Sequence, residues 1–229
     1  MIPPGLRILV VDDERAIRRY LHASLTAQGI VVVEASNGEE ALKAAALERP
    51  DLVILDLGLP DMDGAEVTRR LREWTQIPII VVSVREREED KIAALDAGAD
   101  DYLTKPFGIG ELMARIRVAV RRSATPENEP VFQVGELVVD LAHRSVVVRD
   151  QAVTLTPTEY DILRTLIQHA GFVLTHRQLL RAVWGAGYEE ETHLLRVNVS
   201  NLRAKIEAEP SRPQYILTEP GVGYRLKSL

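Results

Sequence analysis

Five short apolar runs in the first half of the chain alternate with stretches of helical period, and this alternation constrains the fold most. The runs are rich in Val, Ile and Leu, which favours buried parallel strands over strands with one solvated face. Five β–α units in about 120 residues predict a doubly wound α/β domain with a five-stranded parallel sheet. The predicted strands are Arg7–Val11, Ile30–Glu34, Leu52–Asp56, Ile77–Ser83 and Asp101–Thr104, and the predicted helices are Glu14–Ala27, Gly38–Leu47, Gly64–Glu73, Glu88–Ala97 and Gly110–Arg122.

The second half has a different pattern of predicted secondary structure, in which short strands with alternating polarity precede helices. Thr156 followed by Pro157 and Glu159 is typical of a helix N-terminus, and Gly171 is expected to end that segment. Strands, three helices and a terminal hairpin predict an α+β winged helix-turn-helix domain. The predicted strands are Val131–Asp140, Ser145–Arg149, one near Val153, Gln214–Thr218 and Tyr224–Lys227, and the predicted helices are Pro157–His169, His176–Val183 and Thr192–Glu207.

A polar, proline-bounded segment without periodicity separates the two halves, which is typical of a linker. We therefore expect one domain over residues 1–122, a linker over 123–130 and a second domain over 131–229. Each domain is long enough to bury a core of its own.

Composition excludes several classes of function. The chain has no cysteine, so disulfides and thiolate metal sites are excluded. The N-terminus lacks a signal-peptide pattern and no apolar run approaches the ~20 residues that span a bilayer, so we expect a soluble, cytoplasmic protein. The net charge of −6 argues against polyanion binding by the whole chain, but residues 131–229 carry 11 basic and 11 acidic residues. That half can bind DNA if its basic residues cluster.

The strand ends of the first half carry the polar residues that stand out. Asp12 and Asp13 follow the first strand, Asp56 ends the third, Ser83 ends the fourth and Lys105 follows the fifth. Open α/β sheets bind ligands at this edge. Three carboxylates brought together repel one another and need a cation, and Mg²⁺ suits an all-oxygen site with open positions. With a lysine for fixed charge and a hydroxyl donor, the set predicts phosphoryl transfer to a carboxylate.

An alternative is that these residues serve only the fold. Asp12 and Asp13 could cap the helix that follows them, and Ser83 and Lys105 could be ordinary residues at strand ends. The joint interpretation is favoured because four strand ends of one sheet carry compatible chemistry.

The segments that carry this chemistry closely resemble the receiver domains of two-component response regulators, and the second half resembles the OmpR/PhoB class of output domain. The resemblance covers nearly the whole chain. In the receiver it rests on Val11–Glu14, Asp51–Asp56, Leu59–Gly64 and Asp100–Phe107. A finer similarity, to the regulators of a high-affinity potassium-uptake operon, rests on Asp56–Pro60, Lys105–Leu112, Leu174–Leu180 and Thr218–Arg225.

The resemblance implies a role for each residue of the acidic edge. It makes Asp56 the phosphoacceptor for a sensor histidine kinase, with Lys105 pairing with the phosphoryl oxygens. Asp13, Asp56 and the carbonyl of Gly58 would bind Mg²⁺, and Asp12 would act directly or through water. Ser83 would move to hydrogen-bond the phosphoryl group, and Tyr102 would turn inward behind it. Gly58 and Arg85 occupy positions at which the family tunes dephosphorylation. The chain would be a transcription factor that catalyses only its own phosphotransfer and dephosphorylation.

The fourth and fifth predicted helices carry charges of both signs, whose ordinary fate is a solvated surface linked by ion pairs. The resemblance implies instead that two activated receivers form a symmetric dimer through this face. A two-fold interface must be self-complementary, which opposite charges on one face allow. The implied pairs are Lys91 with Glu111, Asp101 with Arg115 and Asp100 with Arg122, around Ile92, Leu95 and Ala114.

Helix 192–207 separates into two faces. Its apolar residues Leu195, Val199, Leu202 and Ile206 recur at spacings of four and three, as in a core-facing stripe. Arginine can form paired hydrogen bonds to guanine, and asparagine can form them to adenine. The polar face opposite the apolar stripe is therefore suited to contacting bases in promoter DNA. An isolated amphipathic helix would look the same, but a hairpin follows this one. The candidates for base or phosphate contact are His193, Arg196, Ser200, Arg203 and, in the hairpin, Arg225.

The hairpin departs from the common pattern of the class. Glu219 and Pro220 stand where many members carry an arginine before the turn, which puts an arginine wing in the minor groove in doubt. The loop Trp184–Glu191 lies where the class contacts RNA polymerase, although an acidic solvated loop is an equal alternative.

Three other functions compete with this one. An aspartyl-phosphate phosphatase needs a second carboxylate two residues after its nucleophile, and Gly58 occupies that position. A DNA-binding protein with a vestigial receiver would not need the full set Asp13, Asp56, Ser83 and Lys105. In a receiver whose second half docks protein, loss of Arg196 and Arg203 would be harmless.

Overall fold

The computed structural model describes residues 5–85, 87–124 and 131–228, and the chain divides into two compact units, Met1–Ala124 and Thr125–Leu229. Most of the expected linker, residues 125–130, lies outside the described residues. None of the helices in the described ranges combines the length and apolarity needed to cross a lipid bilayer.

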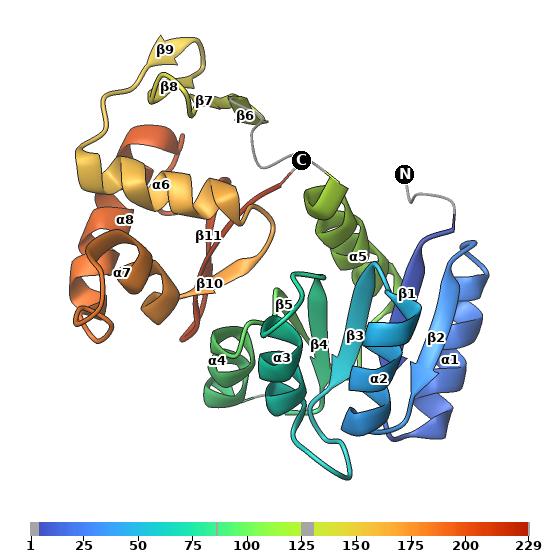
Figure 1. The fold of residues 1–229 in the computed structure, drawn as a ribbon. Helices are drawn as coiled ribbons and strands as arrows, with labels where there is room; N and C mark the ends of the chain where they lie inside the picture. Colours follow the sequence, from blue (N-terminus) through green and yellow to red (C-terminus); the bar gives the residue numbers. More distant parts are fainter. Residues whose placement is uncertain (1–4, 86, 125–130, 229) are drawn as a thin grey trace. The chain divides into compact units, whose positions relative to one another are not determined.

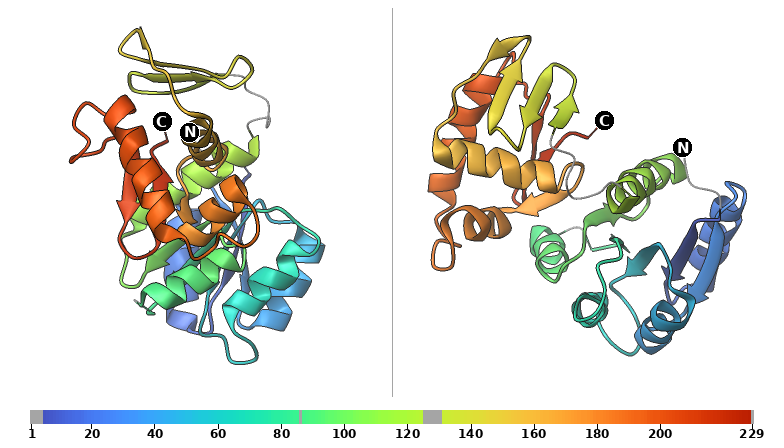
Figure 2. Two further views of the ribbon diagram at one scale, coloured as in Figure 1. Left: turned by 90° about the vertical axis from the view of Figure 1, so that its left-hand side faces the viewer. Right: turned by 45° about the horizontal axis from the view of Figure 1, so that its top comes forward.

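The first unit is the expected doubly wound domain. Its five strands are all parallel and lie in the order β2-β1-β3-β4-β5 (Figure 1). Helices α2, α3 and α4 cover one face of the sheet, and α1 and α5 the other (Figures 1 and 2). The elements are β1 (Arg7–Val11), α1 (Arg15–Thr26), β2 (Val31–Ala35), α2 (Gly38–Glu48), β3 (Leu52–Asp56), α3 (Gly64–Arg72), β4 (Ile79–Ser83), α4 (Glu88–Asp96), β5 (Asp101–Thr104) and α5 (Ile109–Ala124).

The apolar runs form the strands because both faces of the sheet are covered. All five residues of β3 and of β4 are buried, as the unbroken Val, Ile and Leu runs predict. Strand β4 begins two residues later than expected, at Ile79. Pro78 has no N–H, and the carbonyl of Ile77 accepts a hydrogen bond from Arg72 at 2.7 Å.

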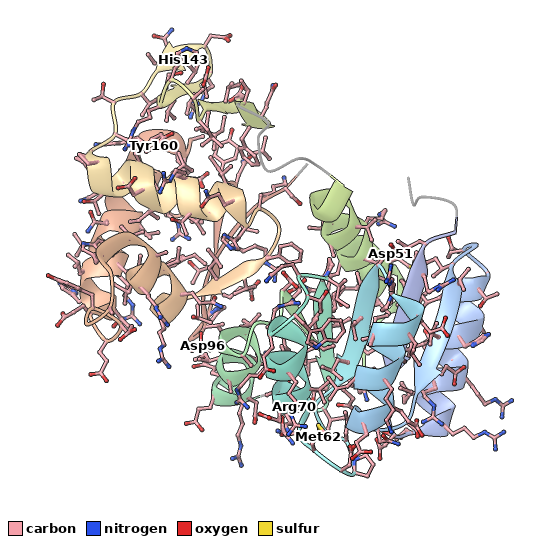
Figure 3. All side chains as sticks on the ribbon, in the orientation of Figure 1. Asp51, Met62, Arg70, Asp96, His143 and Tyr160 are labelled. Atoms are coloured by element: carbon pink, nitrogen blue, oxygen red, sulfur yellow. The ribbon has the colours of Figure 1, made fainter. Side chains whose placement is uncertain are left out.

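The order of the strands places a switch point between β1 and β3, where the chain reverses its direction of winding. Ligands of such sheets bind outside the carboxyl ends of the strands at this point. In Figure 3, Asp51 marks the amino end of β3, and Met62 lies in the loop that follows its carboxyl end. The polar residues of interest all follow or end strands at that carboxyl edge.

Within residues 131–228, the second unit contains two antiparallel sheets and three helices. A four-stranded sheet has the order β6-β7-β8-β9, and a three-stranded sheet has the order β10-β12-β11. The winged helix-turn-helix expectation is confirmed. The elements are β6 (Val131–Val134), β7 (Leu137–Asp140), β8 (Ser145–Val148), β9 (Gln151–Ala152), α6 (Pro157–Gln168), β10 (Val173–Thr175), α7 (His176–Trp184), α8 (Thr192–Ile206), β11 (Ile216–Glu219) and β12 (Gly223–Leu226).

One expectation for this unit was wrong, and one strand was missed. Val131–Asp140 is two paired strands rather than one, because the chain turns at Gly135, whose φ of +56° lies in the left-handed region that favours glycine. Strand β10 was not expected, since its three residues are too few for a periodicity to show. It is stabilised by antiparallel pairing with β12, so that Leu174 lies opposite Tyr224.

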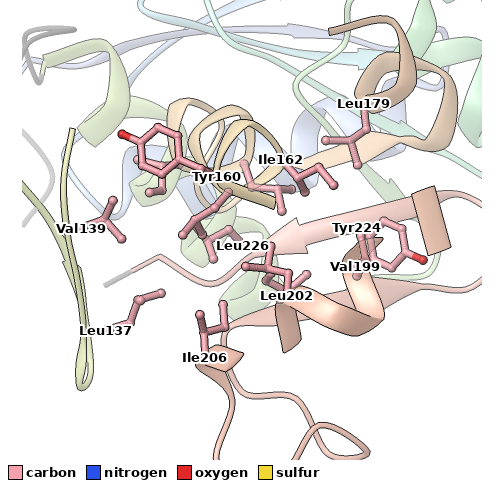
Figure 4. Close-up of a cluster of buried hydrophobic side chains, with 14 of the residues drawn as sticks. Leu137, Val139, Tyr160, Ile162, Leu179, Val199, Leu202, Ile206, Tyr224 and Leu226 are labelled. Atoms are coloured by element: carbon pink, nitrogen blue, oxygen red, sulfur yellow. The ribbon is translucent and has the colours of Figure 1, made fainter. Parts of the chain in front are cut away.

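One core holds the second unit together. Side chains from β7, α6, α7, α8 and β12 meet in it, and Figure 4 shows Tyr160, Leu202 and Leu226 among them. Helix α6 begins with a capping box in which the Thr156 side chain accepts from the Glu159 N–H and the Glu159 carboxylate accepts from the Thr156 N–H. Glu159 is buried and its carboxylate also accepts from Lys205 of α8 at 2.7 Å.

The close approach of α3 to β3 predicts that Gly64→Ala destabilises the first unit. A Cβ at Gly64 would lie 2.3 Å from the carbonyl oxygen of Asp56 and 2.8 Å from Cα of Leu57. We expect a loss of about 1–3 kcal/mol in the free energy of unfolding, measured by urea denaturation. Gly110→Ala is the control, because a Cβ there meets nothing within 4 Å in α5 and a gain of about 0.5–1 kcal/mol is expected. Equal stability of the two variants would contradict this account.

The ion pair between Glu159 and Lys205 predicts a pH-dependent contribution to stability. Burial alone would raise the pKa of Glu159, but hydrogen bonds from Lys205 and Thr156 outweigh it and lower the pKa. The contribution is therefore complete above the pKa of the unfolded chain and is lost as pH falls through the lowered value. Glu159→Gln should cost about 1.5–3 kcal/mol at pH 7 and much less in acid, whereas Glu209→Gln, in an exposed pair, should cost less than about 1 kcal/mol. A pH-independent cost in urea titrations would show that the charge does not matter.

Candidate functional site

The carboxyl edge of the parallel sheet brings the expected residues together. Asp12 leaves β1, Asp56 ends β3 and Lys105 follows β5. Strands β1 and β3 are neighbours, and β4 lies between β3 and β5. Asp12 is fully buried and Asp56 is 6% exposed. Two acidic groups thus lie inside the domain, and the buried Ser83 ends the neighbouring strand β4.

Lys105 links the two buried carboxylates. Its Nζ donates to Oδ2 of Asp12 at 2.7 Å and to Oδ2 of Asp56 at 2.6 Å. The remaining oxygens are also satisfied, since Oδ1 of Asp12 accepts from the Glu14 N–H at 2.9 Å and Oδ1 of Asp56 from the Gly58 N–H at 3.2 Å. Buried charges are tolerated only when paired in this way.

The electrostatics of this group follow from burial and pairing. Burial raises the pKa of Asp12, and the hydrogen bond from Lys105 opposes but does not cancel that effect. Burial would lower the pKa of Lys105, but hydrogen bonds to Asp12 and Asp56 outweigh it and raise the pKa. The lysine is therefore firmly cationic at neutral pH.

A third carboxylate completes a candidate cation site. One oxygen each of Asp12, Asp13 and Asp56 lie within 4.8 Å of one another. Asp13 is exposed, whereas the other two are buried, so the group opens to solvent on one side. Oxygen ligands with open positions suit Mg²⁺, which keeps several of its waters. The residues present fit that ion.

Ser83 and Tyr102 are joined through Arg85. The Ser83 hydroxyl oxygen accepts from the Arg85 N–H at 3.2 Å, and the Tyr102 hydroxyl donates to the Arg85 carbonyl at 2.6 Å. The Arg85 guanidinium pairs with Asp63 at 2.8 Å and lies 3.8 Å from Asp90. Tyr102 is 8% exposed, and burial raises the pKa of its hydroxyl. The ring of Tyr102 therefore already points inward.

Sequence reasoning missed two residues that shape this edge. Arg18 of α1 donates to the carbonyls of Asp12 and Asp13, and Asp61 accepts from the N–H groups of Gly38 and Glu39 at the start of α2. Both residues are visible in the sequence, but their partners are main-chain groups, which a pattern of side chains does not reveal.

The face formed by α4, β5 and α5 holds the expected dimer residues in different environments. Asp101 is buried and pairs with Arg115 of the same chain, which also bonds Glu111 at 2.9 Å. Asp100 pairs with Arg72 at 2.7 Å. Leu95 is 1% exposed and packs into its own domain, so it presents no surface to a second copy. The accessible members are Lys91, Ile92, Glu111 and Ala114, and the side chain of Arg122 lies outside the described part.

Helix α8 has the two faces that its sequence predicts. Leu195, Val199, Leu202 and Ile206 are at most 1% exposed and form part of the core. His193, Arg196 and Ser200 are exposed on the other side. Of the candidate nucleic-acid contacts, these three are available at the surface.

The other two candidates, Arg203 and Arg225, are engaged within the domain. The Arg203 guanidinium donates to the carbonyl of Ile216 at 2.6 Å and to Thr218 at 2.8 Å, and it lies 5.5 Å from the ring centre of Tyr224. Arg225 pairs with Glu219 at 2.8 Å. Their spacing in the sequence did not reveal these partners because both are contributed by the hairpin fold.

Two family models match the chain, one in each unit. Residues 8–117 match the response regulator receiver domain, and residues 150–226 match the transcriptional regulatory protein, C-terminal domain.

Known proteins resemble the chain over nearly its full length. The KDP operon transcriptional regulatory protein KdpE of Escherichia coli is 52% identical over 219 residues, which are 95% of this chain and 97% of that protein. KdpE of Mycobacterium tuberculosis is 49% identical, over 96% of this chain and 99% of its own. The structure of DrrB, an OmpR/PhoB homologue of Thermotoga maritima, covers 98% of this chain and 100% of its own with 31% identity and a TM-score of 0.52. The chain therefore belongs to the two-component response regulators of the OmpR/PhoB type, with an N-terminal receiver domain and a C-terminal DNA-binding domain.

Proposed function

We propose that phosphorylation of Asp56 by a sensor histidine kinase switches this response regulator into a dimer that binds promoter DNA. The observation that carries the proposal is the Lys105 ammonium bound to both Asp12 and Asp56, with Asp13 alongside. This arrangement combines a carboxylate nucleophile, fixed positive charge and a candidate cation site in one place.

In the proposed reaction a carboxylate oxygen of Asp56 forms a bond to phosphorus as the P–N bond to the donor histidine breaks. Asp12, Asp13, Asp56 and the Gly58 carbonyl would hold Mg²⁺, which supplies neutralisation of the phosphoryl charge when bound. Lys105 has three N–H donors, so it can pair with a phosphoryl oxygen while keeping a bond to Asp12. The receiver thus catalyses its own phosphorylation and dephosphorylation, with Gly58 and Arg85 at positions that bear on the lifetime.

Ser83 and Tyr102 would carry the signal away from Asp56. The Ser83 hydroxyl, whose oxygen accepts from the Arg85 N–H here, would turn to donate its proton to a phosphoryl oxygen. That movement would disturb the loop whose carbonyl receives the Tyr102 hydroxyl. Phosphorylation of Asp56 would in this way shift the conformation of the loop that precedes α4.

The dimer is proposed to form through α4, β5 and α5 of two receivers. Lys91 and Glu111 are accessible and of opposite charge, as a self-complementary interface requires. Asp101 and Arg115 are bonded within one chain here, so an exchange between copies would have to replace those bonds. Asp100 of one copy is proposed to pair with Arg122 of the other. Leu95 would contribute indirectly, by packing inside its own domain beneath the interface residue Ile92.

The DNA-binding unit is proposed to read promoter DNA with His193, Arg196 and Ser200 of α8. Arg203 and Arg225 would position the hairpin against the helix and reach phosphates only by releasing their present partners. The acidic loop between α7 and α8 is the proposed contact with RNA polymerase. We assign residues 1–122 to the receiver, 123–130 to a linker and 131–229 to the DNA-binding domain, in a cytoplasmic protein.

The regulated genes are proposed to be a kdp operon for potassium uptake. Two relatives with the name KdpE match at 52% and 49% identity over nearly the whole chain. The direct test of this assignment is binding of the protein to the kdp promoter of the genome that encodes it.

The phosphoacceptor assignment predicts that Asp56→Asn abolishes phosphorylation. Incubation with acetyl phosphate and Mg²⁺ should give a slower band on a phosphate-affinity gel for the native chain and none for the variant, because an amide is not a nucleophile for this transfer. Asp150→Asn is the control, since Asp150 lies in a turn of the other unit with a φ of +59° that asparagine also tolerates. Equal phosphorylation of Asp56→Asn would move the acceptor elsewhere.

The exposed face of α8 predicts that Arg196→Ala weakens DNA binding. Loss of one arginine contact to a base or phosphate should cost about 1–3 kcal/mol of binding free energy, measured by fluorescence anisotropy at fixed salt. Arg164→Ala removes the same charge from an exposed site on α6 and should leave the affinity nearly unchanged. Full affinity in the Arg196 variant would exclude this face as the reading surface.

A further inference from the structure

The three carboxylates at the sheet edge are not held equally well by the protein. Lys105 and a backbone N–H hold Asp12, and Lys105 and the Gly58 N–H hold Asp56. Among the described residues, none donates a hydrogen bond to the exposed carboxylate of Asp13. The direction of that side chain therefore depends on the backbone that carries it.

The backbone on both sides of Asp13 is held by one guanidinium. Nη1 of Arg18 donates to the carbonyl of Asp12 at 2.6 Å and to the carbonyl of Asp13 at 2.9 Å. These two carbonyls belong to the peptide units that precede and follow Cα of Asp13, so fixing both restricts its φ and ψ. The Arg18 side chain is only 15% exposed, which keeps water from competing strongly for these bonds.

Arg18 is in turn oriented from strand β2. Its Nε lies 3.4 Å from Oε2 of Glu34, whose other oxygen is 2.7 Å from Nδ1 of His22. Glu34 lies next to the site because β2 pairs with β1 in parallel, with Val10 opposite Glu34. Glu34 on β2 thus orients Arg18, and Arg18 in turn holds the backbone of Asp12 and Asp13 that follows β1.

We propose that Arg18, oriented by Glu34, is a positioning residue for the divalent cation of the receiver, acting through the backbone of Asp13. Mg²⁺ requires near-ideal octahedral geometry, so a small rotation of one carboxylate weakens binding. This inference rests on the proposed function of the acidic edge, because it concerns the ion that the phosphotransfer needs.

The sign of the effect separates positioning from charge. A positive charge near a cation site repels the cation, so its removal should strengthen binding if Arg18 acts through charge alone. If Arg18 positions Asp13, its removal should weaken binding, as loss of residues that orient metal ligands does by about 10-fold or more.

The test measures Mn²⁺ affinity of the full chain from the electron paramagnetic resonance signal of the free ion, since carboxylate sites accept Mn²⁺ as well as Mg²⁺. We expect about 10-fold weaker binding for Arg18→Met and a smaller loss in the same direction for Glu34→Gln. Arg19→Met is the matched control, because Arg19 is exposed on the same helix and its loss changes the charge equally. Mg²⁺ competition should show the same ranking.

Each outcome bears on a different claim. Unchanged or tighter Mn²⁺ binding by folded Arg18→Met, or equal weakening by Arg19→Met, would overturn the positioning role. If Arg18→Met does not fold, as judged by urea denaturation without metal, Arg18→Lys decides the matter, because it keeps the charge and loses the guanidinium. Binding like that of the native chain would overturn the proposal, and weaker binding would support it. No Mn²⁺ binding by the native chain would instead refute the proposed cation site itself.

Discussion

The receiver depends on one interaction, the bond of a lysine ammonium to two buried carboxylates from different strands. Without Lys105, Asp12 and Asp56 would be two like charges in a site where one is fully buried and the other 6% exposed. Removing one partner of such a group is strongly destabilising because a buried charge is left uncompensated. The strand order β1-β3-β4-β5 is what allows the loop after β5 to reach the ends of β1 and β3.

That same bond leaves the site poised for chemistry. The ammonium lies 2.6 Å from an oxygen of Asp56. In the proposed reaction, the positive charge for an incoming phosphoryl group would therefore be in place beforehand. Ser83 and Tyr102 both bond to the backbone of Arg85, close in sequence to the start of α4, and this is the route by which the proposed signal would reach that helix. The buried ion pairs and the residues of the proposed signal thus lie at the same carboxyl edge of the sheet.

Sequence reasoning succeeded where local pattern decides the outcome. Val, Ile and Leu runs predicted the strands, strand ends predicted the acidic group, and helical spacing predicted the buried stripe of α8. It failed where tertiary partners decide. A glycine turn split Val131–Asp140, and β10 depends on its pairing with β12. Arg18 and Arg203 bond to main-chain carbonyls, which a pattern of side chains does not reveal. The burial of Leu95 likewise depends on how α4 is rotated against its own sheet.

The central claim, that phosphorylation of Asp56 drives dimeric DNA binding, is tested most directly by selecting bound sequences from a random DNA pool. The selection is run with the native chain and Mg²⁺, with and without beryllofluoride as a mimic of the phosphoryl group. The account predicts a paired site with half-sites about one helical turn apart, enriched much more strongly with beryllofluoride. Equal enrichment in both arms would leave DNA binding intact but contradict the switch, and a single unpaired half-site would contradict the dimer.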